Sequence, residues 1–477
     1  MPQLTVTQLD QFGIISDKPA HTLPINAFSD GVNVKFSDGA ARKVQGYKAV
    51  LGSLSTTPTF LRTMYDQLCY CGTSAVYTVK NGTHYEITRT TTGANMVFDG
   101  GMNDYDDSKP WWTLGNGWSI NTTTDKAHCN GSQGAVSSLS QNISIVQGRS
   151  YSVTFTLSNY SAGTLTPKVG GVAGTARSAN GTFTETITAS AITDTLLALE
   201  ANSTFVGDVT DISCSQTQSA YNGTANLGWN GDALGGVGYL NNAVDTPQMW
   251  NPLSQSTKLD NLTHWPAGTT IRSLRFFKSF LIGIFPTKGG IAFPQMIKWS
   301  HPTEPGQVPV SWDVGDASKL AGETVIDETG SALVEGMPLR DQFIVYKDDQ
   351  IWSLTYVGPP YVWKVAPVVK SLGLLATNCV AMVEGQHYCM SRDDLYVFDG
   401  HNAKSLLTGR NRAWLEQKID PDNGQRAFVS VNRTEREVWF CFPERSASWC
   451  SLALTYNYAQ NTWGIRDLPN ISSMSEV

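Results

Sequence analysis

Charged side chains are scarce in this sequence of 477 residues. They make up 16% of the chain, against roughly 25% in an average globular protein. The 34 Lys and Arg are outnumbered by 41 Asp and Glu, so the net charge is −7. Binding along a nucleic-acid backbone needs an excess of Lys and Arg, so the acidic balance argues against a general nucleic-acid coat protein. The aromatic content of 10% likewise excludes an intrinsically disordered chain.

Long apolar segments and paired cysteines are also missing. No run of about 18 apolar residues occurs, so we expect no membrane span and no stable membrane insertion. The first residues lack the basic and apolar regions of a secretory signal. The eight cysteines form no CxxC pair and no cluster with histidine at zinc-ligand spacing. The sequence therefore predicts reduced thiols in a protein made in the cytosol.

Helical patterns are rare, and short apolar runs alternate with Gly, Asn, Asp and Pro. This texture predicts an all-β protein. An apolar strand, a short turn and an aromatic strand recur together, in copies that begin near residues 60, 238, 273, 338, 384 and 434. Such spacings are typical of β-propeller blades with variable loops. We therefore predict a six-bladed β-propeller; the alternative is an irregular all-β protein whose segments are alike by coincidence.

A segment of different composition interrupts these copies. Residues 92–219 are rich in Thr, Ser, Gly and Asn, and short strands follow one another there at roughly ten-residue spacing. This pattern predicts an inserted β-sandwich of the jelly-roll type. The other regions are an N-terminal extension over residues 1–55 and a propeller body over residues 56–91 and 220–477. Within the extension, Asp38-Gly39 signals a hairpin turn.

The inserted segment resembles the carbohydrate-binding-module-like jelly-roll domains of phage virion proteins. The resemblance covers about 120 residues and rests on four segments in this order: WSI at 118–120, LSQNI at 139–143, GRSYSVTF at 148–155 and GTFTETIT at 181–188. It implies that exposed aromatic rings bind saccharide, and the candidates are Trp111, Trp112 and Trp118. The sandwich core is the favoured place for Trp118, whereas the polar context of Trp111 and Trp112 favours exposure.

Acidic residues gather just before these tryptophans, at Asp99, Asp104, Asp106 and Asp107. Ca²⁺ prefers carboxylate and carbonyl oxygens, so Asp104, Asp106 and Asp107 could hold Ca²⁺, as the acidic loops of some jelly-roll modules do. The spacing does not match an EF-hand loop, and a solvated turn is the simpler interpretation. We expect no other cofactor.

Catalytic motifs are not found. The sequence has no Gly-x-Ser-x-Gly nucleophile elbow, no P-loop and no histidine pair at i, i+4 spacing. No pair among the 41 acidic residues is singled out by its spacing for glycoside hydrolysis. The sequence therefore predicts a protein that is not an enzyme.

Outside the insertion, the chain resembles the tail nozzle proteins of short-tailed bacteriophages, which are also called tail tubular protein B or hub proteins. The segments that carry the resemblance are DQFGIISDKP at 10–19, LPINAF at 23–28 and NVKFSDGAARKVQG at 33–46, and the propeller-like repeats add to it. The family implies a structural protein of the virion tail. Six copies form a ring below the portal and adaptor, and the ring prolongs the DNA ejection channel.

This resemblance also implies partners and contact surfaces. The partners are further copies of the chain in a hexameric ring, the tail adaptor protein, tail fibres or spikes, and genomic DNA that passes without sequence-specific binding. An acidic wall repels phosphate and lets a duplex slide, which agrees with the net charge. Side-to-side contacts in a closed ring need apolar surface, and Phe12, Phe28 and Phe36 are the candidates.

The alternative hypothesis is a carbohydrate-binding or depolymerising tail protein. Such a protein would capture host surface glycans through the inserted sandwich.

Overall fold

The computed structural model describes residues 7–9, 11–64, 66–89, 92–104, 111–145, 147, 150–217, 221, 228–250, 258–407 and 409–475. Strands dominate this part of the chain, and its α-helix α1 (Arg412–Lys418) has only seven residues, so the predicted all-β class is confirmed. The chain divides into two compact units, one of residues 1–89 and 221–477 and one of residues 90–220. Among the described residues, no helix is long and apolar enough to cross a membrane.

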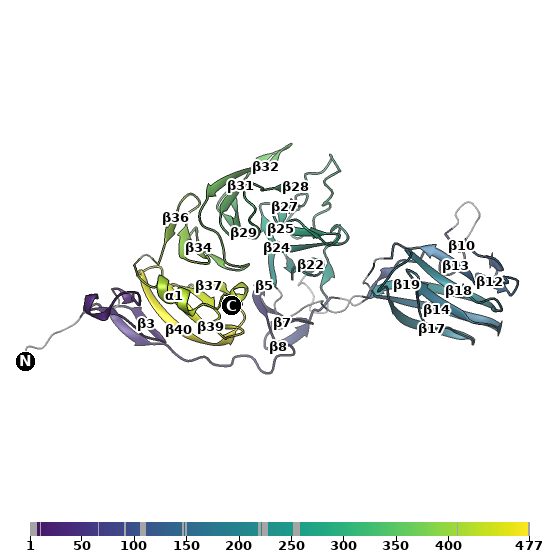
Figure 1. Ribbon diagram of the computed structural model, residues 1–477, viewed down its shortest axis with the longest axis horizontal. Helices are drawn as coiled ribbons and strands as arrows, with labels where there is room; N and C mark the ends of the chain where they lie inside the picture. The colour runs from purple at the N-terminus through teal and green to yellow at the C-terminus, as the bar shows by residue number, and fades with distance from the viewer. Residues whose placement is uncertain are drawn as a thin grey trace, which may run out of the picture. The chain divides into compact units, whose positions relative to one another are not determined.

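Six four-stranded antiparallel meanders make up most of the first unit, as far as it is described. They follow one another in a ring (Figure 1), and residues in or next to their strands line one cavity. The predicted six-bladed propeller is therefore confirmed. We number the blades 1 to 6 in chain order. Blade 1 contains β5 (Phe60–Met64), β6 (Gln67–Cys71), β7 (Val76–Lys80) and β8 (Thr83–Glu86); blade 2 contains β20 (Asn230–Leu234), β21 (Val237–Asn241), β22 (Gln248–Trp250) and β23 (Asp260–Asn261); and blade 3 contains β24 (Thr269–Phe277), β25 (Phe280–Lys288), β27 (Met296–Trp299) and β28 (Gly322–Val325), with β26 (Ile291–Ala292) beside β25. Blade 4 contains β29 (Leu333–Leu339), β30 (Gln342–Lys347), β31 (Ile351–Gly358) and β32 (Val362–Val369); blade 5 contains β33 (Val380–Val383), β34 (Gln386–Met390), β35 (Leu395–Phe398) and β36 (Ala403–Ser405); and blade 6 contains β37 (Phe428–Asn432), β38 (Glu437–Phe442), β39 (Cys450–Asn457) and β40 (Thr462–Ile471).

Tight turns join consecutive strands where the sequence supplies residues that tolerate positive φ. Asn81 and Gly82, between β7 and β8, have φ of +51° and +75°. Asp38 and Gly39 have φ of +53° and +78°, which confirms the predicted hairpin turn. Positive φ at both central residues matches the right-handed twist of the flanking strands.

The N-terminal arm, which we define as residues 7–43, extends the outer edge of blade 6. Its strand β1 (Gly13–Ile14) runs parallel to β40 and pairs with β2 (Ala27–Phe28). The hairpin of β3 (Val34–Ser37) and β4 (Ala40–Lys43) packs on β40, and the short 3-10 helix η1 (Ala20–Thr22) lies between β1 and β2. Gly13 has a φ of +66°, and a Cβ there would lie 2.6 Å from the Trp463 carbonyl oxygen. Only glycine fits this contact.

Polar contacts fasten the arm to the helix that precedes blade 6. The Asp17 carboxylate accepts hydrogen bonds from the backbone N–H groups of Ala413 (3.0 Å) and Trp414 (3.1 Å) in the first turn of α1. A negative charge is favourable at the N-terminal end of a helix. The backbone N–H of Ser16 donates to Asn411 Oδ1 at 2.9 Å. The 3-10 helix η2 (Gly424–Arg426) then leads into β37.

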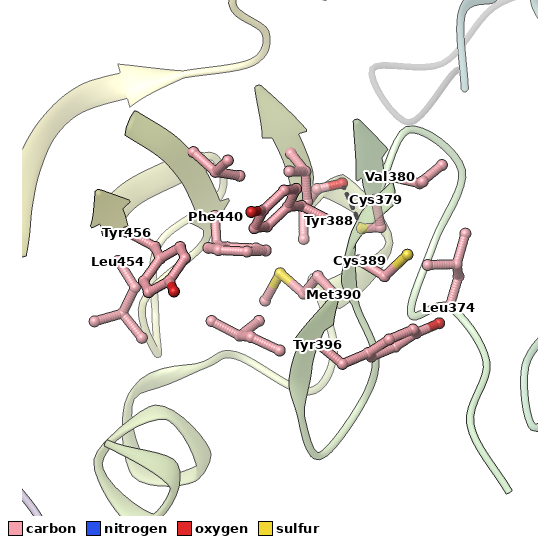
Figure 2. Packing of buried hydrophobic residues seen from close by; sticks show 14 of the residues in the cluster. Leu374, Cys379, Val380, Tyr388, Cys389, Met390, Tyr396, Phe440, Leu454 and Tyr456 are labelled. Atoms are coloured by element: carbon pink, nitrogen blue, oxygen red, sulfur yellow. Dashed lines mark hydrogen bonds between the residues drawn. The ribbon is translucent and has the colours of Figure 1, made fainter. Parts of the chain in front are cut away.

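Apolar side chains fill the space between neighbouring blades. One buried cluster joins blades 2 and 3, a second joins blades 3 and 4, and a third runs from blade 4 through blades 5 and 6 to the N-terminal arm. Figure 2 shows part of the third cluster, in which Met390 and Tyr388 of β34 lie near Phe440 of β38 and Tyr456 of β39. The aromatic residues that recur in the sequence copies therefore form the contacts between blades.

His387 on β34 is buried. His387 Nε2 lies 3.0 Å from the Pro338 carbonyl oxygen, and Nδ1 lies 2.7 Å from the Tyr346 hydroxyl. A carbonyl oxygen only accepts hydrogen bonds, so Nε2 carries the proton and Nδ1 accepts from Tyr346. Burial disfavours the charged ring and lowers the pKa of His387 to about 4.

This neutral histidine makes the protein sensitive to acid. The unfolded chain binds the proton with a pKa near 6.5, so the stabilisation is complete above about pH 6.5. It is lost progressively as the pH falls toward 4, by about 3 kcal/mol in total. We expect urea unfolding to show this loss for the unmodified chain and a flatter pH profile for His387→Gln. The exposed control His264→Gln should keep the original profile. An identical profile for His387→Gln and the unmodified chain contradicts this assignment.

The second unit is a sandwich of two sheets. One sheet contains β10 (Thr113–Leu114), β13 (Ser137–Asn142), β18 (Leu196–Ala201), β15 (Leu165–Val169) and β16 (Val172–Ala173); the other contains β11 (Trp118–Asn121), β12 (Lys126–Asn130), β19 (Val206–Thr217), β14 (Ser150–Ala162) and β17 (Gly181–Thr188), with β9 (Thr92–Asn95) paired to β19. Alternate residues of β14 from Tyr151 to Leu157 are buried. The first and last strands pair, with Asn95 opposite Ser215. The chain therefore enters and leaves this unit side by side, which suits an insertion.

Candidate functional site

The first strands of the blades, with the residues next to them, surround a cavity of about 700 Å³ at the centre of the propeller. Every blade contributes to its wall. The charged side chains of the described lining are all arginines: Arg62, Arg272, Arg275, Arg426 and Arg433.

Two of these arginines pair with carboxylates of the next blade. Arg275 Nη2 of blade 3 lies 2.7 Å from Glu335 Oε2 of blade 4, and both side chains are buried. Arg62 Nη2 of blade 1 lies 2.9 Å from Asp232 Oδ1 of blade 2. Asp232 Oδ2 also accepts from the backbone N–H of Phe276 in blade 3 at 2.9 Å. These contacts connect blades 1 to 4 around the cavity.

Asn378, just before β33, extends the connection to blade 5. Its Oδ1 accepts from Arg275 Nη2 at 3.2 Å, and its backbone N–H donates to Glu335 Oε2 at 3.2 Å. Its Nδ2 donates to the Trp229 carbonyl oxygen at 2.9 Å. Burial lowers the pKa of the Arg62 guanidinium, and the Asp232 carboxylate offsets part of this effect. We call the set of Arg62, Asp232, Arg275, Glu335 and Asn378 the inter-blade network.

The inter-blade network should dominate the effect of substitutions near the cavity. Glu335→Gln removes a buried charge and leaves Arg275 buried without its counter-ion. We expect unfolding in urea to show a loss of about 3–5 kcal/mol. The exposed pair of Lys370 and Glu328 provides the control, because Glu328→Gln should cost less than about 1 kcal/mol. Equal effects of the two substitutions would contradict the role assigned to the network.

The structure places the three tryptophans that are predicted to stack on sugars in different environments. Trp112 is only 1% exposed and belongs to the sandwich core; its Nε1 donates to the Asp99 carbonyl oxygen at 3.0 Å. The expectation that Trp112 is exposed is therefore wrong. Its neighbours in sequence are polar, but the core of the sandwich covers its ring. Trp118 is also buried in the core. Neither ring can stack on a saccharide.

Trp111 differs from the other two. It is 40% exposed and stacks on Phe98, which is 58% exposed, with ring centroids 5.3 Å apart and an interplanar angle of 19°. Phe98 was not among the sequence candidates. Its position beside the acidic segment at Asp99 is the signal in the sequence that could have suggested it.

The acidic cluster falls only partly within the described residues. Asp106 and Asp107 lie outside them, and Asp104 is exposed. Asp99 Oδ1 accepts from the backbone N–H groups of Asn103 (2.9 Å) and Asp104 (3.1 Å), which is the geometry of a turn. In the described part of the chain, no group of three or more His, Cys, Asp or Glu side chains could hold a metal ion.

The three phenylalanines predicted to contact another subunit, Phe12, Phe28 and Phe36, belong to the N-terminal arm. Phe36 is only 4% exposed and packs in the apolar cluster of blades 4 to 6, so the prediction that it contacts another subunit is wrong: blade 6 of its own chain covers it. Phe28 is half-buried against Phe36, with ring centroids 5.1 Å apart. Phe12 is half-buried.

The inter-blade network was missed by sequence reasoning. The dipeptide Leu-Arg occurs at the same place in three of the sequence copies, as Leu61-Arg62, Leu274-Arg275 and Leu339-Arg340, and the first two of these arginines belong to the network. This repetition is the signal that could have pointed to it. The carboxylate partners lie 170 residues away for Arg62 and 60 residues away for Arg275, and the spacing alone does not identify them.

No family model matches the chain, and no curated protein matches it in sequence. Among solved structures, Hsv2 of Kluyveromyces lactis aligns over 51% of this chain and 65% of its own, with 11% identity and a TM-score of 0.29. Apo AztD of Citrobacter koseri aligns over 76% of this chain and 90% of its own, with 10% identity and a TM-score of 0.30. The chain spans 60% and 65% of the two Hsv2 structures that it matches. At these TM-scores the structural similarity supports no conclusion about this chain. The propeller fold is established by the sheet topology described above.

Proposed function

We propose that the protein is a structural component of a bacteriophage tail that forms a closed ring of six copies, the tail nozzle. In this role the ring prolongs the DNA ejection channel below the portal and adaptor, and fibres or spikes attach to it. The protein catalyses no reaction. The propeller forms the wall of the ring, and the inserted sandwich is a separate appendage of the same chain.

The architecture supports this proposal. The described chain has a six-bladed propeller, an N-terminal arm on its last blade and a sandwich inserted after its first blade. The propeller agrees with the propeller-like repeats that add to the resemblance to tail nozzle proteins. The path of the DNA in this proposal is the axis of the ring. The cavity inside each propeller has a volume of about 700 Å³, which is the size of a small-molecule site, so it is not a passage for a DNA duplex.

The observation that supports a ring is the exposure of apolar side chains on blades 3 and 4. Tyr361, between β31 and β32, is 81% exposed, and Val357 near the end of β31 is also exposed. Val325 is exposed on β28, the edge strand of blade 3, and so is Ile291 on β26. A contiguous exposed apolar patch marks a surface for protein contacts, and we infer that these side chains belong to one. A ring closes when such a surface meets a different surface of the next copy.

The ring can be tested with substitutions that leave the fold intact. We expect mass photometry of the purified chain to show closed rings of six copies. The double substitution of Tyr361→Ser and Val357→Ser should weaken ring formation about tenfold or more. It should not change the unfolding temperature of the single chain, because both side chains are exposed. Val50→Ser, at an exposed position outside the blades, is the control. Rings that form equally well with the double variant contradict this assignment of the contact surface.

The second candidate function is capture of a host surface glycan by the sandwich. The stacked and exposed pair of Phe98 and Trp111 favours it, because flat aromatic surfaces suit the apolar faces of sugar rings.

A binding assay on an array of bacterial surface polysaccharides tests this function. Trp111→Ala should lower the affinity about tenfold or more, whereas Val136→Ala, at another exposed apolar position of the sandwich, should not. If no polysaccharide on the array binds, or if Trp111→Ala binds as well as the unmodified chain, the sandwich does not capture glycans through this pair.

A further inference from the structure

A connection without helix or strand, residues 44–59, joins the N-terminal arm to blade 1 (Figure 1). Residues 45–50 are all exposed, and Val50 is 88% exposed. Lys48 is the only lysine or arginine of this connection. Exposed irregular segments are preferred sites of proteolytic cleavage. The connection therefore offers a single target to a protease that cuts after basic residues.

The connection is also longer than the path that it covers. On the arm side, the Tyr47 hydroxyl donates to the Asp467 carbonyl oxygen at 2.9 Å. On the blade 1 side, Ser472 Oγ donates to the Pro58 carbonyl oxygen at 2.8 Å. The five residues from Asp467 to Ser472 span at most about 18 Å. The eleven residues from Tyr47 to Pro58 can span up to about 40 Å, so the connection can enter a protease without pulling the arm away.

The arm is held on blade 6 by contacts of its own. Gly13 of β1 pairs with Trp463 of β40, and Ile14 is fully buried in the apolar cluster of blades 4 to 6. The backbone N–H of Ser16 donates to Asn411 Oδ1 at 2.9 Å. Asn411 Nδ2 in turn donates to the Ile14 carbonyl oxygen at 3.2 Å.

The hairpin of β3 and β4 adds a second set of contacts. The backbone N–H of Asn33 donates to the Ile465 carbonyl oxygen at 2.8 Å. Asn33 Oδ1 accepts from the backbone N–H of Asp467 at 3.1 Å, and Lys35 Nζ lies 2.7 Å from Glu435 Oε2. None of these contacts is formed by the connection, so we expect them to survive a cut within it.

We propose that the peptide bond between Lys48 and Ala49 is a processing site for proteases that cut after lysine or arginine, and that the arm stays bound to blade 6 after the cut. Hydrolysis adds one water molecule: Lys48 gains a terminal carboxylate, and Ala49 gains a terminal amino group. The outer edge of β40 then holds the arm as a bound peptide, in the manner of strand addition at a sheet edge. This inference does not depend on the proposed ring.

Exposed basic residues in tight turns provide the comparison. Lys278 lies between β24 and β25, where Phe277 and Phe280 pair directly. Arg436 lies in the turn between β37 and β38, just before Glu437, which pairs with β37. Paired strands on both sides keep such turns from opening as extended segments, so a protease should cut them more slowly than the connection.

Limited digestion of the purified full chain with trypsin tests the proposal. We expect denaturing mass spectrometry to show a fragment that ends at Lys48 and one that begins at Ala49, before any cut after Lys278 or Arg436. Size-exclusion chromatography without denaturant should keep the two fragments together. Lys48→Gln should abolish this cut, whereas Lys278→Gln should leave its rate unchanged.

A variant of the arm separates docking from cleavage. Gly13→Ala places a Cβ 2.6 Å from the Trp463 carbonyl oxygen, so the cleaved variant should lose its arm fragment at least about tenfold faster than the cleaved unmodified chain. Ile25→Ser, at a position of the arm that is 66% exposed, should retain the fragment. The proposal is overturned if trypsin cuts after Lys278 or Arg436 before it cuts after Lys48, or if the arm fragment separates from the cleaved unmodified chain on the column.

Discussion

Arg275 and Glu335 face each other across the boundary between blades 3 and 4, and both are buried. Loss of either charge would leave the other buried without its counter-ion, which is strongly destabilising, so we infer that the pair favours this arrangement of blades 3 and 4. Asp232 extends this constraint to blades 1 and 2, and Asn378 extends it to blade 5. Hydrogen bonds at 2.7–2.9 Å need a defined direction between donor and acceptor, which apolar contacts do not. The polar network at the centre thus sets the arrangement that the aromatic side chains stabilise.

The chain closes the propeller where blade 6 meets blade 1. As at the other blade boundaries of the described chain, the two sheets share no strand. Residues after β40 reach blade 1: Ser472 Oγ donates to the Pro58 carbonyl oxygen, and the Thr63 backbone N–H donates to Ser475 Oγ at 3.0 Å. The N-terminal arm holds the outer edge of blade 6, and Tyr47 just after the arm donates to the Asp467 carbonyl oxygen. Both ends of the first unit therefore contribute to closing the propeller.

The blades could be predicted from the sequence because their signals are local. Alternating strands, and turns such as Asp38-Gly39, depend only on neighbouring residues. The candidate sites were harder, because burial depends on distant segments. Trp112 is covered by the core of the sandwich, and Phe36 is covered by blade 6, and in neither case do the adjacent residues reveal it. The partners in the inter-blade network are brought together only when the propeller closes.

We propose that this chain forms the wall of a closed ring in a phage tail, and a cryo-electron microscopy reconstruction of the tail of a virion that carries the protein would decide the matter. We expect six copies in a closed ring on the tail axis, below the portal and adaptor, with a propeller in each copy. A trimer in a peripheral spike, or a particle that lacks the protein, would contradict it.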